Sequence, residues 1–495
     1  MKRIISLAIM FATLFTLTIP VCAEPQKTKA EIVSEFKTTV QIGTWIPYIL
    51  TDDGAKTMKE NGIDFIFIWW YDNYENAIAL CEKYDIKCIV DAGIREASTD
   101  DDIKELMNKS YWQSPAVIGY YIIDEPSAVK FDFIAHALTI TKTEQPDLIP
   151  YVNLFPEYAS SEQIGTSSFE EYMRLFTEKI DVDYISTDVY PYYMDGTDTK
   201  YLTSIDTTNQ QCIKTNRDHW LHIQSMGFGA NRSPSAEDLT AQMYIGLSFG
   251  VSKFMHFCYA IPHPGLYEAK EFFGASVTYT GEKTEVWNYT KAMNDELKAI
   301  SPVVEKYKNV GAFTVAPQQG RVPLYVYSYN QKRQQYTGFN DFFKTLTSLR
   351  SSIVGCFESK DDSGNRAFTL VNSSEITYNQ TSKIEFSFNT PQIVTAYPNG
   401  IKTVLQPNEN GVYTIDLGIG DGVFIETENA VITSGDVNSD GKVSLIDAMI
   451  SFMSVSGKTN LNYYEKCAAD LDNNGTVSLS DAMKVFMNIA GKVSI

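Results

Sequence analysis

The feature that most constrains the fold is a series of strand-length apolar runs that alternate with helix-like segments between residues 41 and 259. The runs are rich in β-branched and aromatic residues, which suit buried strands. They are Gln41–Tyr48, Ile63–Trp70, Ile86–Gly93, Val117–Asp124, Leu148–Phe155, Val182–Tyr190, Trp220–Ser225 and Lys253–Tyr259. The helix-like segments include Asn76–Lys83, Asp101–Lys109, Phe131–Thr143, Ser168–Lys179 and Leu239–Gly250. This alternation predicts an α/β fold, a (β/α)8 barrel over residues 35–300. A doubly wound open sheet is the alternative, but no glycine-rich dinucleotide loop follows any of the runs.

In a barrel of this type, the residues that bind and convert a ligand lie at the carboxyl ends of the strands. Those ends carry aromatic rings, carboxylates and amides in this sequence. Rings stack on the C–H faces of sugars, and carboxylates and amides bind sugar hydroxyl groups. The candidate substrate-binding residues are Trp45, Trp69, Trp70, Asp91, Asn153, Tyr190, Gln224 and Tyr259.

Glu125 is the leading candidate for a catalytic acid. It follows an apolar strand directly, and Pro126 stops that strand. A partly desolvated glutamate in this place has a raised pKa and can protonate a departing glycosidic oxygen, whereas the alternative reading is a structural salt bridge. The stretch from Asp124 to Pro126 resembles the Asn-Glu-Pro of strand four in retaining-superclan barrel glycoside hydrolases, with Asp124 in place of the asparagine. Residues 40–300 also resemble bacterial β-galactosidase-like barrels, and the resemblance implies a glycoside hydrolase.

The sequence departs from that family at the end of the seventh strand. The retaining enzymes carry a nucleophilic glutamate there, and this chain has Gln224. An amide cannot form the covalent glycosyl intermediate, so a second carboxylate must come from elsewhere. Asp188 at the end of strand six is the first choice and Asp91 at the end of strand three the second. A wide separation from Glu125 predicts inversion of the anomeric carbon, and a narrow one predicts retention.

Other chemistries are less well supported. Cys258 with His256 or His222 suggests a thiol nucleophile, but no orienting Asn or Asp is identifiable and a buried thiol is the simpler reading. The five histidines lack the spacing of a catalytic zinc site, so no cofactor is expected for catalysis. With 61 acidic and 41 basic residues the net charge is −20, which disfavours nucleic acid and anionic membranes as partners.

Beyond the barrel, residues 301–430 change character. Short alternating runs are separated by turns that contain Asn, Gly and Pro. The runs are Leu324–Tyr329, Ala367–Val371, Lys383–Phe388, Ile393–Tyr397 and Tyr413–Leu417. This pattern predicts an antiparallel all-β sandwich domain. A β-domain that packs on the barrel as a spacer is favoured over an independent sugar-binding module.

Two similar loops near the C-terminus place oxygen-bearing side chains at positions 1, 3, 5, 9 and 12 around a glycine at position 6. A calcium ion needs this spacing, because a tight loop must wrap several oxygen atoms around one hard cation. The first loop offers Asp436, Asn438, Asp440, the Lys442 carbonyl, Ser444 and Asp447, and the second offers Asp470, Asp472, Asn474, the Thr476 carbonyl, Ser478 and Asp481. An amphipathic run follows each loop, so a small helical domain that binds two Ca²⁺ ions is predicted.

The pair of loops resembles a type I dockerin, the module that attaches cellulosomal enzymes to the cohesins of a scaffoldin. The resemblance covers residues 433–495 and implies a cohesin partner. Loop positions 10 and 11, which help dockerins choose a cohesin, are Leu445 and Ile446 in the first copy and Leu479 and Ser480 in the second. They differ from the familiar clostridial pairs, so the type of cohesin stays open.

Residues 1–23 are predicted to be a signal peptide, because two basic residues precede an uncharged apolar run that ends in Val-Cys-Ala. Lipidation at Cys22 is the minor alternative. The whole sequence therefore predicts a secreted, extracellular, cellulosome-bound glycoside hydrolase that acts on plant polysaccharide or oligosaccharide. The alternative is an inactive barrel that binds plant carbohydrate.

Overall fold

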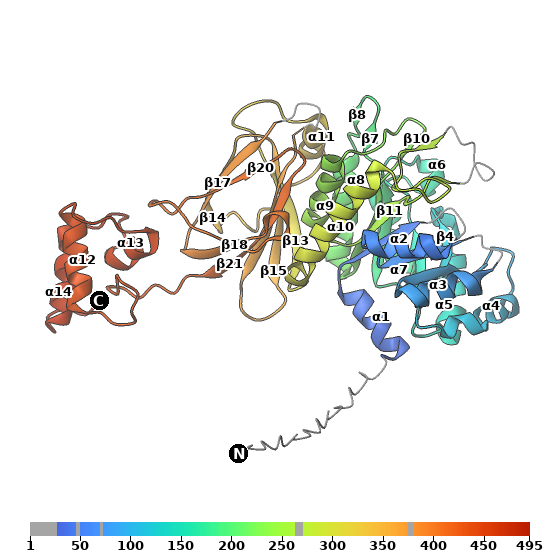
Figure 1. The fold of residues 1–495 in the computed structure, drawn as a ribbon, viewed down its shortest axis with the longest axis horizontal. Coiled ribbons are helices and arrows are strands. Elements are labelled where there is room, and N and C mark those ends of the chain that lie inside the picture. Colours follow the sequence, from blue (N-terminus) through green and yellow to red (C-terminus); the bar gives the residue numbers. More distant parts are fainter. Residues whose placement is uncertain (1–26, 46–49, 70–72, 263–270, 375–379) are drawn as a thin grey trace, which may run out of the picture.

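The computed structural model describes residues 27–45, 50–69, 73–262, 271–374 and 380–495. Figure 1 shows three parts along the long axis of the molecule: a barrel surrounded by helices at one end, antiparallel sheets in the middle, and a small group of helices at the other end. The predicted signal peptide and Trp70 lie outside the described residues.

A nearly closed barrel of eight parallel strands confirms the predicted α/β barrel in the described part of the chain. The sheet runs from β5 through β4, β3, β2 and β1 to β11, β9 and β6. A bridge between Leu154 and Thr187 joins its two edges. The strands are β1 (Gln41–Trp45), β2 (Phe65–Ile68), β3 (Lys87–Asp91), β4 (Val117–Asp124), β5 (Ile149–Asn153), β6 (Tyr184–Val189), β9 (Asp218–Gln224) and β11 (Val251–Phe257).

The strands form where apolar residues can be buried on both faces. All four residues of β2 are buried, as expected for a parallel strand covered by helices. Gly43 in β1 has a packing role, because a Cβ atom there would lie 2.3 Å from the ring of Phe65 on the neighbouring strand. A side chain at this position would force the two strands apart.

Helices cover the outside of the barrel, and short elements decorate its loops. The helices are α1 (Lys29–Thr38), α2 (Asp52–Asn61), α3 (Tyr74–Tyr84), α4 (Asp100–Met107), α5 (Phe131–Glu144), α6 (Ser161–Ile164), α7 (Phe169–Lys179), α8 (Tyr201–Thr215), α9 (Ala236–Ser248) and α10 (Glu285–Val304). The short elements are the hairpin β7 (Tyr192–Tyr193) and β8 (Gly196–Thr197), the pair β10 (Gly227–Phe228) and β12 (Phe272–Phe273), and the 3-10 helices η1 (Ser110–Gln113) and η2 (Ala128–Lys130).

Two antiparallel sheets follow the barrel and confirm the predicted sandwich. The larger has the order β13 (Tyr307–Val315), β15 (Ser352–Ser359), β16 (Arg366–Asn372), β21 (Gly422–Asn429), β18 (Gln392–Ala396) and β19 (Thr403–Leu405). The smaller has the order β14 (Phe343–Ser348), β17 (Ser382–Phe388) and β20 (Tyr413–Leu417). The loops of this part include η4 (Pro398–Gly400).

The prediction of a strand at Leu324–Tyr329 was wrong, because these residues lie in the helix α11 (Leu324–Lys332). Tyr325, Val326 and Tyr329 are buried, and this spacing fits one face of a helix. The ring of Tyr325 lies 6.4 Å from that of Tyr201 in α8, so packing against the barrel decides the conformation of this segment.

The larger sheet is buried on both faces. Alternate residues of β15 point in opposite directions: Ile353 and Phe357 join the core of the barrel, and Val354 and Cys356 join the core between the two sheets. Gly355 lies against α9, where an added Cβ would be 2.4 Å from the Cα of Ser248. This close contact makes the sandwich a continuation of the barrel.

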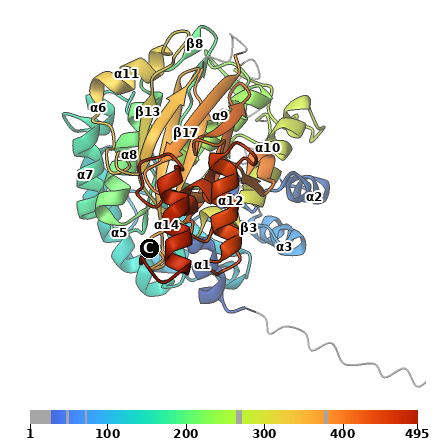
Figure 2. The same cartoon turned by 90° about the vertical axis from the view of Figure 1, so that its left-hand side faces the viewer.

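The C-terminal helices form the far end of the molecule. They are α12 (Leu445–Val455), α13 (Tyr463–Ala469) and α14 (Leu479–Ile489). Figure 2 shows α12 and α14 in front of the sheets, at the outer end. The α13 helix contacts the sandwich, where the Tyr464 hydroxyl donates to the Gln392 carbonyl (2.9 Å) and the Lys466 ammonium pairs with Glu409 (3.2 Å).

Candidate active site and candidate calcium loops

Glu125 lies directly after β4, at the carboxyl end of the barrel. Its backbone is left-handed, with φ at 43°, which costs a residue other than glycine some conformational energy. Its N–H donates to the carbonyl of Asn153 at the end of β5 (2.9 Å). The pairing of the two neighbouring strands therefore fixes the place of this carboxyl group.

Asn153 links the carboxylates at this end of the barrel. Its amide nitrogen donates to Oδ1 of Asp124 (3.2 Å) and to Oδ1 of Asp188 (3.1 Å). The side chains of Glu125 and Asp188 share a hydrogen bond. The structure thus brings the two predicted catalytic residues into direct contact, beside the predicted ligand residue Asn153.

Burial and mutual repulsion make these carboxyl groups hold their protons. Desolvation, followed by the charge of Asp124, raises the pKa of Glu125 to about 7. Desolvation, followed by the charges of Glu125 and Asp124, raises the pKa of Asp188 well above its usual range. Asp124 is exposed as a whole residue, but the protein around its carboxyl group displaces water. This desolvation raises the pKa of Asp124 to about 6. At neutral pH the cluster therefore retains at least one transferable proton.

A buried chain of polar groups supports Asn153 from inside the barrel. The Ser186 hydroxyl donates to the Asn153 side-chain oxygen (3.0 Å), and the Tyr151 hydroxyl bonds to Ser186 (2.8 Å) and to Nε2 of His222 (2.7 Å). Burial lowers the pKa of His222 to about 3, so its ring is neutral. These residues position Asn153 and supply no proton of their own at neutral pH.

Aromatic rings surround the carboxyl cluster on the side of the first strands. The ring of Trp45 lies 4.9 Å from that of Trp69, and Trp69 lies 4.8 Å from Tyr121. The Tyr121 hydroxyl is buried and has no hydrogen-bond partner among the described residues. The predicted residues Trp45 and Trp69 thus form one surface with Tyr121, next to the charge of Asp124.

Tyr190 lies on the other side of the cluster. Its ring packs 4.9 Å from Phe257 and 5.3 Å from Phe228. The charge of Asp188 contributes to the raised pKa of its hydroxyl, after the larger effect of desolvation. Tyr190 therefore lies close enough to Asp188 to be affected by its charge.

Two other predicted residues, Asp91 and Tyr259, have structural partners. Asp91 is buried and pairs with Arg95 (3.1 Å), and its Oδ1 accepts the N–H of Gly93 (2.9 Å). The hydroxyl of buried Tyr259 accepts the indole N–H of Trp287 (3.1 Å). The structure does not bring Asp91 into the carboxyl cluster as an alternative second carboxylate.

Gln224 is fully buried at the end of β9 and fastens the loops that follow β6 and β9. Its Oε1 accepts the N–H of Tyr192 (2.8 Å), and its Nε2 donates to the carbonyls of Tyr192 (3.1 Å) and Arg232 (2.7 Å). Both of its amide hydrogens and one lone pair of its oxygen are engaged by the backbone. These contacts give Gln224 a structural role, and its role in substrate binding stays a prediction.

No role was predicted for Asp124 or Tyr121. The signal for Asp124 was present, since it precedes Glu125 at a strand end. Tyr121 is harder to find because the pairing of β4 with β5 shifts register between Tyr121 and Ile123. Such an irregularity breaks the two-residue alternation from which the inner face of a strand is inferred.

The thiol chemistry considered for Cys258 has no support in the structure. Burial raises the pKa of this thiol well above its usual range. Nε2 of His256 bonds to the side-chain oxygen of Asn294 (2.9 Å), and burial lowers the pKa of His256 to about 4. A neutral thiol beside a neutral imidazole lacks the thiolate that such a nucleophile needs.

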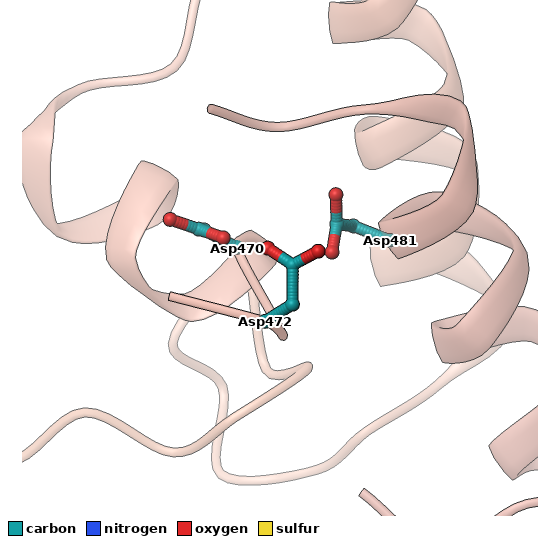
Figure 3. Close-up of side chains that lie close together, drawn as sticks. All are labelled: Asp470, Asp472 and Asp481. Atoms are coloured by element: carbon teal, nitrogen blue, oxygen red, sulfur yellow. The ribbon is translucent and has the colours of Figure 1, made fainter. Parts of the chain in front are cut away.

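The second C-terminal loop gathers three carboxylates that can hold a cation. Asp470, Asp472 and Asp481 each place an oxygen atom within 4.8 Å of the others, and Figure 3 shows these side chains converging. The Gly475 N–H donates to Asp470 (2.7 Å), and the φ of Gly475 is 87°, so glycine permits the tight turn around the site. Three clustered carboxylates in this loop fit a hard divalent cation.

The first loop has the same hydrogen bond from its glycine N–H to its first aspartate, but its three aspartates are arranged differently. The Gly441 N–H donates to Asp436 (2.9 Å), as its counterpart does in the second loop. The carboxylate of Asp440 accepts the Asn438 amide (3.0 Å), and in the described part of the chain the three aspartates of this loop do not converge as those of the second loop do. The position-9 serines, Ser444 and Ser478, begin α12 and α14 and donate to Asp447 (2.8 Å) and Asp481 (2.6 Å).

These loops lie within the part of the chain that has a family match. Residues 434–490 match the dockerin type I domain. The match confirms the resemblance predicted from the two loops, and this part is called the dockerin region below. Members of that family bind calcium, in agreement with the donor set of the loops.

Several solved structures resemble the chain weakly. A β-galactosidase from the psychrophilic Marinomonas ef1 has 10% identity and a TM-score of 0.41, over 60% of this chain and 66% of that one. A xylanase from Thermotoga maritima has 12% identity and a TM-score of 0.38, over 55% and 98%. A β-glucuronidase from Ruminococcus gnavus has 10% identity and a TM-score of 0.39, over 52% and 49%. No curated protein matches the sequence. None of the described helices is long and apolar enough to cross a bilayer.

Proposed function

We propose that the chain is a secreted glycoside hydrolase of plant polysaccharide or oligosaccharide, anchored in a cellulosome by its dockerin region. The observation that carries the proposal is the contact of Glu125 with Asp188 at the carboxyl end of the barrel, with the pKa of Glu125 raised to about 7. A carboxylic acid that keeps its proton at neutral pH and lies beside a second carboxyl group is what acid-catalysed glycoside cleavage requires.

In the proposed reaction, Glu125 donates its proton to the glycosidic oxygen as the bond between that oxygen and the anomeric carbon breaks. Water supplies the hydroxyl group that ends on the anomeric carbon, and its remaining proton returns to the carboxyl pair. Asp188 shares a hydrogen bond with Glu125, and because the pKa of each carboxyl group is raised by burial and by the charge of its neighbours, the two groups can hold one proton between them. The negative charge left on the pair after proton transfer stabilises the positive charge that develops on the sugar ring.

The contact between the two carboxyl groups is closer than the separation in either known class of enzyme. Retaining enzymes have about 5–5.5 Å between the two groups, and inverting enzymes have about 6.5–9.5 Å. A sugar bound at this site must therefore part Glu125 from Asp188. The anomer released by the enzyme reports how far they separate.

The rings of Trp45, Trp69 and Tyr121 support a carbohydrate as the substrate. They form a surface beside the carboxyl cluster, and the unpartnered Tyr121 hydroxyl can accept or donate a hydrogen bond to a sugar hydroxyl. The four adjacent polar groups of Asp124, Glu125, Asn153 and Asp188 supply further partners for hydroxyl groups.

The dockerin region is proposed to bind two Ca²⁺ ions and a cohesin module. Exposed apolar side chains occur at equivalent positions of α12 and α14: Leu445 and Met449 in the first, and Leu479 and Met483 in the second. They belong to α12 and α14, which Figure 2 shows in front of the sheets at the outer end of the molecule. A partner can therefore cover them without displacing the barrel.

The test is product release from a panel of plant cell-wall polysaccharides, oligosaccharides and aryl glycosides. Wild type is compared with Glu125→Gln and with Glu162→Gln, a control that changes an exposed glutamate. We expect Glu125→Gln to lower kcat at least about 100-fold on any active substrate, since it removes the general acid. Equal rates in wild type and Glu125→Gln would contradict the proposal.

One observation favours a second candidate function, a barrel that binds plant carbohydrate without cleaving it. Gln224 occupies the end of the seventh strand, where a retaining enzyme needs a carboxylate, and its amide is committed to the backbone. This candidate predicts glycan binding with no product from any substrate of the panel.

A further inference from the structure

A large cavity lies outside the carboxyl cluster, between the barrel and the sandwich. Its volume is about 880 Å³. The β7–β8 hairpin and α9 line one side, and residues 320–327 at the start of α11 line the other. Figure 1 shows α11, β7 and β8 along the same edge of the molecule. Asp124, Glu125 and Asp188 are not among the described residues that line it, so this is a separate space.

Five of the described residues that line the cavity are tyrosines. Tyr192, Tyr193 and Tyr201 come from the barrel side, and Tyr325 and Tyr327 come from α11. Tyr327 is 54% exposed at the mouth of the cavity. An exposed ring at the mouth of a cavity provides a flat surface on which the C–H face of a sugar can stack.

The charged groups of the wall balance one another. Arg232 binds Asp238 through both of its terminal nitrogens and lies 4.8 Å from the ring centre of Tyr192. The other two charged residues among the described part of the wall, Asp195 and Arg321, have opposite signs. With no net charge among the described residues of its lining, the cavity favours a neutral ligand over a charged one.

A buried polar group of the wall lacks a partner. Tyr201 is 1% exposed, and its hydroxyl makes no hydrogen bond with any described residue. Buried hydroxyl groups in folded proteins are nearly always paired, and an exception needs an explanation. A ligand hydroxyl in the cavity would supply the missing partner.

We propose that this cavity is a second carbohydrate-binding site, which takes a neutral oligosaccharide. Tyr327 supplies the stacking surface, the Tyr201 hydroxyl pairs with a hydroxyl of the ligand, and the partly exposed guanidinium of Arg232 presents a further polar surface. The site holds sugar without cleaving it, since its described residues include no carboxyl pair like that of Glu125 and Asp188. The inference stands whether or not the barrel hydrolyses glycosides.

The experiment measures binding by titration calorimetry on the full chain carrying Glu125→Gln, so that the probe is not consumed. The probes are cellohexaose, xylohexaose and mannohexaose, with hexagalacturonate as the charged comparison, each up to about 1 mM. Tyr327→Ala and Tyr201→Phe are added to this background. Tyr279→Ala, which removes an exposed tyrosine outside the cavity, is the control.

We expect at least one neutral hexaose to bind, and Tyr327→Ala to weaken that binding about tenfold or more, with no change for Tyr279→Ala. Tyr201→Phe should weaken binding about five- to tenfold, the effect of one lost hydrogen bond. Because the same substitution removes an unpaired buried hydroxyl, the melting temperature of the free protein should stay constant or rise. A purely structural role for Tyr201 would give the opposite pattern, a lower melting temperature with unchanged affinity.

Three outcomes overturn the proposal. They are failure of every neutral hexaose to bind, affinities unchanged by both Tyr327→Ala and Tyr201→Phe, and preference for hexagalacturonate over all three neutral probes. If Tyr327→Ala does not fold, Tyr201→Phe decides alone, since it adds no atom and removes only the hydroxyl.

Discussion

Asn153 binds two carboxylates with a single amide group, and this arrangement sets the electrostatics of the candidate active site. It holds Asp124 and Asp188 close enough to repel each other and Glu125, so each addition of charge raises the cost of the next ionisation. The position of these groups at strand ends was predictable from the sequence, because strands four to six are long apolar runs. The salt bridge between Asp91 and Arg95 was not predictable, since it depends on the conformation of the loop after β3.

The first prediction concerns Asp124→Asn. The charge of Asp124 raises the pKa of Glu125, so its removal should lower that pKa and move the alkaline limb of the activity profile to lower pH. Relative to its own optimum, the variant should lose about three- to tenfold more activity at pH 8 than wild type. The measurement is kcat/KM between pH 4 and pH 9, with Glu162→Gln as the control. A limb that stays in place would show that Asp124 does not act on Glu125.

The second prediction concerns the stability of Glu125→Gln. Because the pKa of Glu125 rises from an ordinary 4.5 to about 7, the folded state binds more protons than the unfolded state between these pH values. The stability due to this group is therefore fully present below about pH 4.5 and is lost as the pH rises through about 7.

Glu125→Gln should therefore stabilise the protein more at pH 8 than at pH 5, by about 1–2 kcal/mol. Urea unfolding followed by tryptophan fluorescence at the two pH values measures the difference. An equal effect at both values would mean that Glu125 ionises as an ordinary exposed glutamate does.

At the level of elements, strand positions were predictable and one local conformation was not. The run Val117–Asp124 is the strand β4 without any change of bounds, because a strand buried on both faces must be apolar along its length. Leu324–Tyr329 alternates like a strand but forms a helix, because Tyr325, Val326 and Tyr329 are buried on one side. Tertiary packing decided that conformation, and a single sequence holds no information about which surface is available to pack against.

The third prediction tests the role of Gln224 at the end of β9. Gln224→Glu restores the carboxylate that a retaining barrel enzyme carries, but it places a charge in a fully buried site whose partners include two carbonyl oxygens. We expect a loss of about 2–5 kcal/mol in the free energy of unfolding and no gain of activity. Gln113→Glu, which changes an exposed glutamine of η1, is the control, measured by the same urea unfolding. Gain of hydrolysis with unchanged stability would contradict the structural role assigned to Gln224.

At the level of the whole molecule, the three parts are joined by contacts of different strength. The barrel and sandwich share a buried apolar interface, as Ile353 and Phe357 show. The dockerin region touches the sandwich mainly through polar contacts of α13, such as the hydrogen bond between the Tyr464 and Tyr413 hydroxyls (3.0 Å). Its own buried apolar residues are few and mostly small: Val437, Ala448, Leu461, Ala468, Ala469, Ala482 and Val485. Loss of the dockerin fold should therefore leave the other two parts intact.

The fourth prediction follows from this division. Each calcium loop carries three aspartates, whose repulsion opposes folding unless a cation balances it. Excess chelator should unfold residues 433–495 and abolish cohesin binding, while hydrolysis by the barrel continues. Limited proteolysis should then remove the dockerin region and spare a fragment that ends near residue 430.

Asp470→Ala should produce the same cleavage at lower chelator concentration than wild type. Asp362→Ala, which changes an exposed aspartate of the sandwich, is the control and should behave as wild type does. Cohesin binding that persists in excess chelator would contradict the calcium-dependent fold, and loss of hydrolysis under the same conditions would mean that the barrel depends on the dockerin region through the contacts of α13.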